Sequence, residues 1–312
     1  MNARLASIVS AITLLIWSFP ALAQHELDLL FGYENGAVTI MQPQVHPVRR
    51  MVTPQPNTYL LDVGMDFFVP DGWSGFMLQR CRVQQVWISP GLVGNKSGVG
   101  TVFSDGATPN YFDLPYRGTP HQHFIFAATM PGVYVFDLRA TNGIDYLGRA
   151  LADMPFVYRI YMVAGNPSQL YGNVQPSSWY TGNLYDLKLR VSVLRSGNEL
   201  GRSEQPVNPW ALYPYLVGFN LTGDAQVAAK LQKHLSLKVS RNLSGSQRLD
   251  WSFSTLGDAN EDDRIDEADL ALVVQHFSSS HPSGELTGNG KVNLDDLLAV
   301  LVNYGRSGED VR

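Results

Sequence analysis

Oxygen-bearing side chains recur at alternate positions in a short segment near the carboxyl end of the chain, which we call loop 1 (residues 258–269). Its donors, at loop positions 1, 3, 5, 7, 9 and 12, are Asp258, Asn260, Asp262, Arg264 (through its backbone carbonyl), Asp266 and Asp269. A calcium ion takes roughly six to eight oxygen ligands, and a tightly curled loop supplies them when donors alternate along the backbone. Loop 1 is therefore predicted to bind Ca2+.

Loop 2 (residues 285–296) repeats this pattern, displaced by 27 positions. Its donors at the same loop positions are Glu285, Thr287, Asn289, Lys291 (through its backbone carbonyl), Asn293 and Asp296. Loop 1 offers four carboxylates and loop 2 only two. Because affinity in such loops rises with ligand charge and rigidity, we expect loop 2 to bind calcium more weakly, or with help from water.

Position 6 of such a loop makes a tight turn that favours glycine. Loop 2 has Gly290 there, whereas loop 1 has Asp263. Aspartate tolerates left-handed backbone geometry better than most residues, so we expect the turn of loop 1 to form at some cost in stability.

Each loop is followed by apolar residues at the helical spacing i, i+3, i+4, i+7. The two stripes are Leu270, Val273, Val274 and Phe277, and then Leu297, Val300, Leu301 and Tyr304. The repetition predicts a duplicated loop–helix unit at 257–312, a small all-α module whose two apolar faces bury only each other. Neither half is expected to be stable alone.

The paired loop–helix units resemble a bacterial type I dockerin module over about 50 residues, ending in Val302-Asn303-Tyr304-Gly305. The resemblance implies that calcium keeps the module folded and that it docks onto a cohesin-like domain or another cell-surface protein. Cellulosomal members often carry a hydroxyl pair at loop positions 10 and 11, where this chain has Glu267-Ala268 and Leu294-Asp295. That departure weakens the case for a standard cellulosomal cohesin. The alternative is a calcium-stabilised terminal cap with no partner.

Residues 1–23 have the pattern of a secretory signal peptide. Arg4 lies in a short basic start, Ile8–Phe19 is apolar, and Ala21-Leu22-Ala23 supplies a small-residue cleavage site. The apolar stretch is shorter than the roughly 20 residues that a membrane-spanning helix requires. We therefore expect a mature chain that begins near Gln24, has no membrane span, and is secreted or held at the surface of a bacterium.

Composition favours strands and turns, because charged residues make up only 16% of the chain and it holds 28 Gly and 18 Pro. We predict a mainly β protein with two β-sandwich domains, at 24–165 and 166–256, ahead of the all-α module. The single cysteine, Cys81, excludes an intramolecular disulfide and is expected to be packed rather than reactive.

Short apolar runs between turn residues mark the predicted strands. In the first domain they are Leu27–Tyr33, Tyr59–Val63, Val83–Ile88, His123–Ala127, Gly132–Ala140 and Phe156–Val163. In the second they are Gln169–Val174, Leu187–Leu194, Tyr215–Leu221, Leu235–Val239 and Asp250–Phe253. The segment Ala225–Gln232 is alanine-rich and is predicted to start a short helix as an alternative to a strand.

Two further resemblances concern the β domains. His25–Gly36, His121–Phe126 and Pro131–Tyr134 are similar to the bacterial surface-protein domain called choice-of-anchor M, which implies an exported cell-envelope protein. Four segments of the second domain are similar to prealbumin-like or carboxypeptidase-regulatory-like sandwiches, namely Gly172–Val174, Lys188–Gly197, Lys230–Val239 and Leu249–Phe253.

His121 and His123 stand two residues apart, so on a strand both imidazoles face the same side. With His25 or His46 they could form a transition-metal site. The favoured interpretation is an ordinary pair of hydrogen-bonded histidines, because no spaced carboxylate completes a metal signature.

The sequence contains no recognisable catalytic constellation. Acidic residues before position 257 are isolated and suggest no carboxylate pair of the kind that glycoside hydrolases use, and no Gly-x-Ser-x-Gly elbow is present. We therefore predict a non-catalytic exported protein. The alternative is a polysaccharide-binding or polysaccharide-degrading protein, with stacking candidates at Trp73, Trp87, Trp179 and Trp210.

Charge is unevenly distributed along the chain. Residues 257–312 hold twelve acidic and four basic side chains, so this region carries a net charge of −8 and the remainder about +3. No basic groove with interleaved aromatic residues is apparent, so a nucleic-acid partner is not expected.

Overall fold

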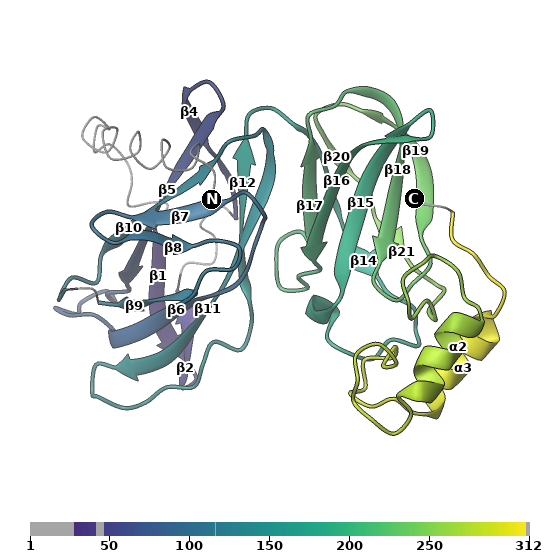
Figure 1. Ribbon diagram of the computed structural model, residues 1–312. Helices are drawn as coiled ribbons and strands as arrows, with labels where there is room; N and C mark the ends of the chain where they lie inside the picture. The colour runs from purple at the N-terminus through teal and green to yellow at the C-terminus, as the bar shows by residue number, and fades with distance from the viewer. Residues whose placement is uncertain (1–27, 42–46, 116, 310–312) are drawn as a thin grey trace. The chain divides into compact units, whose positions relative to one another are not determined.

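The computed structural model describes residues 28–41, 47–115 and 117–309. The predicted signal peptide at 1–23, and also His25 and His46, lie outside the described residues. The chain forms two compact units (Figure 1), one made of residues up to Thr129 with Phe136–Val157, the other of Met130–Val135 with Tyr158–Arg312. Within the described ranges, no helix is long and apolar enough to cross a membrane.

Twelve strands precede residue 165 within the described ranges, and they form two sheets. The larger sheet has the order β2-β1-β5-β10-β7-β8, with β4 also paired to β5. Its strands are β1 (Leu29–Glu34), β2 (Ala37–Ile40), β4 (Val52–Gln55), β5 (Thr58–Phe67), β7 (Val93–Lys96), β8 (Gly100–Phe103) and β10 (Gln122–Ala128). The smaller sheet, in the order β3-β12-β11-β6-β9, contains β3 (Val48–Arg50), β6 (Leu78–Ile88), β9 (Tyr111–Leu114), β11 (Gly132–Asp145) and β12 (Tyr158–Ala164).

Aromatic side chains fill the core of the first unit. The rings of Phe103 on β8 and Phe126 on β10 each lie 4.9 Å, between centroids, from the ring of Phe136 on β11. All three rings are fully buried, and because they come from opposite sheets they close a β-sandwich. The predicted strands of this region are confirmed, and Cys81 on β6 is buried as expected, which raises the pKa of its thiol.

The second unit is also a β-sandwich. Its main sheet has the order β16-β15-β18-β19, and it faces a three-stranded sheet, β17-β13-β20, and a short pair, β14-β21. The strands are β13 (Ser168–Gly172), β14 (Val174–Gln175), β15 (Lys188–Arg195), β16 (Asn198–Pro206), β17 (Tyr215–Phe219), β18 (Gly223–Leu231), β19 (Leu237–Leu243), β20 (Ser246–Arg248) and β21 (Trp251–Ser252). A single 3-10 turn at Leu184–Asp186 precedes β15 in the described chain.

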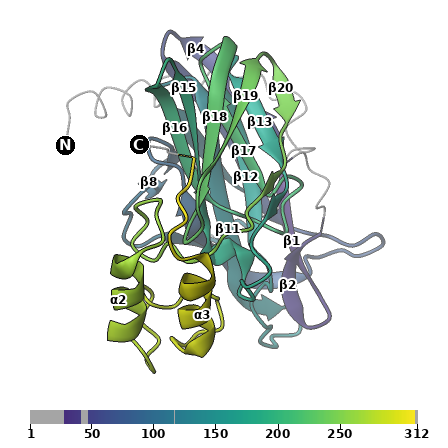
Figure 2. The same cartoon turned by 90° about the vertical axis from the view of Figure 1, so that its right-hand side faces the viewer.

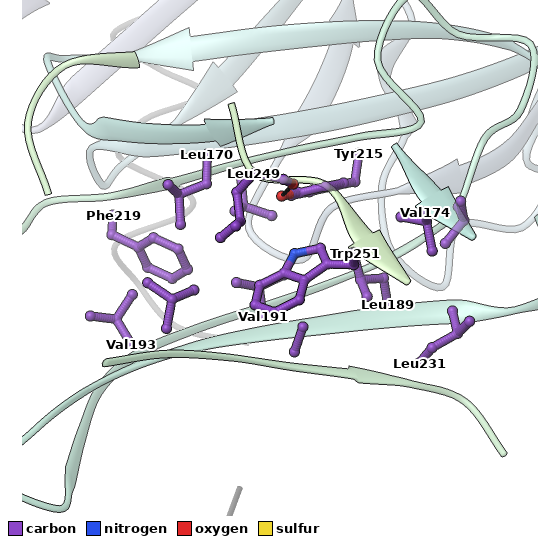
Figure 3. Close-up of a cluster of buried hydrophobic side chains, with 14 of the residues drawn as sticks. Leu170, Val174, Leu189, Val191, Val193, Tyr215, Phe219, Leu231, Leu249 and Trp251 are labelled. Carbon is purple, nitrogen blue, oxygen red and sulfur yellow. Dashed lines mark hydrogen bonds between the residues drawn. The ribbon is translucent and has the colours of Figure 1, made fainter. Parts of the chain in front are cut away.

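Alternation along β15 explains how this core forms. Leu189, Val191 and Val193 are fully buried and point to one face, which is the period of two that a strand imposes. Figure 3 shows these side chains packed around Trp251 of β21 and Phe219 of β17. The predicted second sandwich is therefore present.

The helical alternative for Ala225–Gln232 is wrong, because most of this segment forms β18 in the middle of the main sheet. β18 pairs with β15 on one side and with β19 on the other. Its last five residues are all buried. Pairing on both edges outweighs the helix propensity of the alanines, which is a weak local preference.

The predicted all-α module at 257–312 is wrong. Residues 257–309, the described part of this region, have only two short helices, α2 (Glu267–Gln275) and α3 (Leu294–Asn303), and the rest of that part is turns, bends, isolated bridges and irregular chain. Figures 1 and 2 show the helices side by side at one end of the second sandwich. Their core includes Leu235 and Leu256 of the sandwich, so the region belongs to the second unit.

The two helical stripes are only half buried. Val273 and Val300 are fully buried and Leu270 and Leu297 partly so, but Val274, Phe277, Leu301 and Tyr304 are between 47% and 58% exposed. The apolar faces therefore do not bury only each other, as the sequence predicted. Their inner halves share a core with the sandwich, and their outer halves face solvent.

Candidate functional site

The side chains of loop 1 hold the curl of its backbone. Asn260 Oδ1 accepts a hydrogen bond from the backbone N–H of Asp262 at 3.0 Å, and Asp262 Oδ1 accepts one from the backbone N–H of Arg264 at 3.0 Å. Asp258 Oδ2 accepts from the backbone N–H of Asp263 at 2.9 Å. Donors at positions 1, 3 and 5 therefore share one tight turn, as the alternating spacing predicts.

The carboxylate at position 12 ties the start of loop 1 to the start of α2. Asp269 Oδ1 accepts from the backbone N–H groups of Ala259 and Asn260, and its Oδ2 accepts from that of Asp266. Asp266 in turn caps the helix by accepting from Ala268. This reciprocal capping box fixes positions 9 and 12 relative to each other.

Loop 2 repeats this scaffold at the same loop positions. Asp296 Oδ1 accepts from the backbone N–H groups of Leu286 and Thr287, and its Oδ2 accepts from that of Asn293. Asn293 caps α3, and Asn289 Oδ1 accepts from Lys291. The duplication read from the sequence is thus present in the hydrogen bonds.

Positions 4 and 6 of both loops adopt left-handed backbone geometry. In loop 2 they are Gly288 (φ +76°) and Gly290 (φ +84°), and in loop 1 they are Glu261 (φ +64°) and Asp263 (φ +72°). Loop 1 therefore places two non-glycine residues where glycine is favoured, although the sequence signalled only position 6.

The side chain of Asp263 explains why loop 1 has an aspartate at position 6. Its Oδ1 accepts from the backbone N–H of Ser236 at 2.7 Å, and its Oδ2 accepts from the hydroxyl of the same serine. Its Oδ1 also lies 3.3 Å from Nζ of Lys230. A glycine would remove this attachment of loop 1 to the sandwich, and sequence reasoning did not find it.

The position-1 carboxylate is fully buried in loop 1, where it is Asp258, and largely buried in loop 2, where it is Glu285. The Lys230 ammonium, at the end of β18, contacts Asp258 Oδ2, and the Lys233 ammonium contacts Glu285. The other oxygens, Asp258 Oδ1 and Glu285 Oε1, are buried and have no hydrogen-bond partner among the described residues. A buried carboxylate oxygen without a partner is costly, and a hard cation relieves that cost.

Burial makes negative charge unfavourable in loop 1. It raises the pKa of Asp258 to about 6, against the opposing effect of Lys230, and it also raises the pKa of Asp269. Asn260 and Asp262 are exposed, so an ion can reach the loop from solvent. Carboxylate, amide and carbonyl oxygens are the donor set that calcium prefers, and the residues of loop 1 fit it.

The structure does not bring these side chains into a complete centre. Across the residues that the structure describes, no three His, Cys, Asp or Glu side chains converge as metal ligands would. In both loops the carboxylates turn toward backbone N–H groups and toward the two lysines.

His234 lies at the junction of loops and sandwich and is fully buried. Its Nε2 accepts from the backbone N–H of Ser177 at 3.1 Å, and its Nδ1 lies 2.8 Å from the carbonyl of Gln232. Both ring nitrogens are therefore satisfied in the neutral imidazole. Burial lowers its pKa to about 4.

Acid is expected to destabilise the second unit through His234. The pKa of His234 is lower in the folded than in the unfolded chain. Its contribution to the free energy of unfolding is therefore fully present above about pH 6.5 and is lost as pH falls toward 4, by about 3 kcal/mol in all. Urea denaturation of the chain in chelator at several pH values measures this slope. The raised pKa of Asp258 acts in the opposite direction over this range, so the contribution of His234 is the difference in slope between the wild type and His234→Gln. Equal slopes in the two proteins would contradict the assignment.

The tryptophan candidates occupy different environments. Trp73, Trp179 and Trp210 are 37–44% exposed, whereas Trp87 on β6 is less so. Trp73 packs edge-on against Tyr146 with ring centroids 4.8 Å apart. Trp179 stands beside loop 2, in a depression of about 300 Å³ that Thr181, Thr287 and Asn289 also line.

No protein-family model matches the chain, and no curated protein matches it. Among solved structures, the chain is similar to a type II cohesin–X–dockerin complex from Acetivibrio cellulolyticus, with 14% identity over 46% of this chain and 99% of that chain, at a TM-score of 0.37. It is also similar to the Bacillus anthracis TIE protein, with 7% identity over 81% of this chain and 45% of that one, at a TM-score of 0.21. A third similar structure is the major pilin of Streptococcus pyogenes, with 9% identity over 62% of this chain and 97% of that one, at a TM-score of 0.15. At such scores these likenesses carry no argument about function.

Proposed function

We propose that this protein is an exported, non-catalytic β-sandwich protein whose two C-terminal loops bind calcium and present a docking surface to another extracellular protein. One observation carries the calcium assignment. Both loops hold the same hydrogen bonds at positions 5, 9 and 12, and at position 1 of each a buried carboxylate oxygen has no hydrogen-bond partner in the described chain. Calcium would supply the positive charge that these oxygens lack, and Asp258, Asn260, Asp262 and the Arg264 carbonyl would hold it in loop 1.

The outer halves of the helices support the docking part of the proposal. Six apolar side chains on or next to α2 and α3 are 47–58% exposed, namely Val274, Phe277, Leu294, Leu301, Val302 and Tyr304. Exposed apolar surface of this kind marks protein interaction sites. The partner class that the dockerin resemblance implies is a cohesin-like domain or another cell-surface protein, and the signal-like pattern at 1–23 agrees with that location.

Chelation is expected to destabilise the whole second unit, because Lys230, Lys233 and Ser236 join the loops to the sandwich. Calcium at one hundred times its Kd stabilises a single-site protein by about 2.7 kcal/mol. The melting temperature in chelator should therefore be lower than in calcium by the corresponding amount. Native mass spectrometry should find at least one bound calcium. Melting that is the same with calcium and chelator, together with no bound ion at millimolar calcium, would refute calcium binding.

Calcium-loaded protein is then passed over an immobilised cohesin domain, and retention that chelator abolishes is the expected result for docking.

The depression beside Trp179 favours a second candidate, a glycan-binding protein, because an exposed indole next to hydroxyl and amide groups suits a sugar ring. Retention on insoluble glycans without retention on cohesin would replace the docking proposal with this one.

A further inference from the structure

In the first unit, five side chains gather on one face of β5 and β10. His123 on β10 stands opposite Gly64 on β5, and Asp62 and Asp66 flank that glycine at the same face. His121 immediately precedes β10, two residues from His123. The register therefore brings two histidines against two aspartates.

Gly64 makes room for a third carboxylate. A Cβ at Gly64 would lie 1.9 Å from Oδ1 of Asp28, so no other residue fits there without displacing it. Asp28 is almost fully buried, and its Oδ2 lies 3.7 Å from Nδ1 of His121. The absence of a side chain at one strand position thus places a buried negative charge beside the histidines.

The histidines face each other through the same ring nitrogen. His121 Nδ1 lies 3.0 Å from Asp66 Oδ2, and His123 Nδ1 lies 2.8 Å from Asp62 Oδ1. The two Nε2 atoms lie 2.8 Å apart. Where Nδ1–H of each imidazole donates to its carboxylate in the neutral tautomer, each Nε2 carries a lone pair aimed at the other ring.

Two imidazole nitrogens at this distance are held together by a cation that they share, either a proton in an Nε2–H···Nε2 hydrogen bond or a metal ion. We propose that His121 and His123 bind a divalent transition metal such as Zn2+ through their Nε2 atoms, with Asp62 and Asp66 as positioning residues that hold the rings. Zinc–nitrogen bonds are roughly 2.0–2.1 Å, so two such ligands lie roughly 2.9–3.4 Å apart at right-angled to tetrahedral geometry. The two Nε2 atoms, 2.8 Å apart, need to separate by only a few tenths of an ångström to bind the ion.

The surroundings suit such an ion. Three carboxylates, Asp28, Asp62 and Asp66, outweigh the positive charge of Lys96, which acts electrostatically on His123. The histidine side chains are 31% and 34% exposed, so the ion can enter from solvent. Two imidazoles are borderline-soft ligands that select transition metals over calcium, and water completes the coordination. This site is independent of the loops.

The test titrates the full chain with Zn2+ and with Co2+, in excess calcium so that the loops are supplied. One equivalent should bind with both imidazole signals shifted in NMR, and Co2+ should produce a visible absorption band. His121→Ala or His123→Ala should weaken zinc binding at least about tenfold, and Asp62→Asn about 10- to 100-fold with both ligands intact.

The matched control is His276→Ala with His281→Ala, because these rings stack on each other with centroids 3.8 Å apart in the other unit. That control should leave the affinity unchanged. Metal-free melting of each variant shows that it folds. Zinc affinity that survives His121→Ala and His123→Ala, or no uptake of either ion by the folded wild-type chain, would overturn the proposal.

Discussion

Replacing Lys230 by methionine is expected to lower the calcium-free stability of the second unit by about 3–5 kcal/mol. The Lys230 ammonium is almost fully buried against Asp258, whose side chain is completely buried, and it also lies 3.3 Å from Asp263. Methionine retains the length and apolar stem of lysine but carries no charge. The carboxylate of Asp258 then stays buried without a counter-ion, which is the costly way to break a buried pair. Guanidinium denaturation in chelator measures the loss.

Calcium should recover much of this loss, because a divalent ion in loop 1 supplies the missing positive charge. The stabilisation that calcium gives is therefore expected to be larger in Lys230→Met than in the wild type. Lysine and calcium both act on Asp258, and two cations at one carboxylate repel each other, so removal of Lys230 should also raise the calcium affinity of loop 1.

Lys188→Met is the matched control for this experiment. Lys188 begins the neighbouring strand β15, its side chain is 55% exposed, and its Nζ lies 3.8 Å from Glu204. Exposed pairs of this kind contribute about 0–1 kcal/mol. Equal losses in the two variants would show that the Lys230–Asp258 pair has no special role.

The internal geometry of the loops was predictable because its contacts are local. All the hydrogen bonds of the scaffold in loop 1 lie between Asp258 and Asp269, and each joins residues at most ten positions apart. The spacing of oxygen donors encodes such turns directly, so the repeat of 27 positions predicted the same scaffold in loop 2. Whether each donor binds calcium stays a prediction.

The attachment of the loops to the sandwich was not predictable from the sequence. Lys230 lies 28 positions from Asp258, and Lys233 lies 52 positions from Glu285. A lysine at the end of a strand is usually solvated, so nothing in the sequence indicated that these two would be partly or fully buried. The same long-range packing made β18 a strand and turned the predicted all-α module into part of the second unit.

The histidine pair was predictable only in part. The spacing of His121 and His123 predicted a shared face, but no carboxylate stands near them in the sequence. Asp62 and Asp66 lie 61 and 55 positions away from their partners, and only the register of β5 against β10 brings them together. Strand pairing supplied what the sequence pattern lacked.

Asp258→Asn is expected to reduce calcium binding far more than Glu285→Gln, although both substitutions remove one charge at position 1. Loop 1 has four carboxylates and loop 2 two, so loop 1 supplies most of the calorimetric signal and the tighter site. Asparagine also leaves the buried ammonium of Lys230 with Asp263 as its one remaining carboxylate partner among the described residues. The wild-type isotherm should lose its tighter step in Asp258→Asn and keep it in Glu285→Gln.

The design separates affinity from folding. Both substitutions preserve shape, and urea denaturation in chelator measures how much stability each one costs without calcium. Lys230→Met combined with Asp258→Asn removes both members of the buried pair, so the double variant should be more stable than the sum of the single losses implies. If the two position-1 variants weaken calcium binding equally, ligand charge does not rank the loops, and the backbone strain at Glu261 and Asp263 becomes the term that sets the affinity of loop 1.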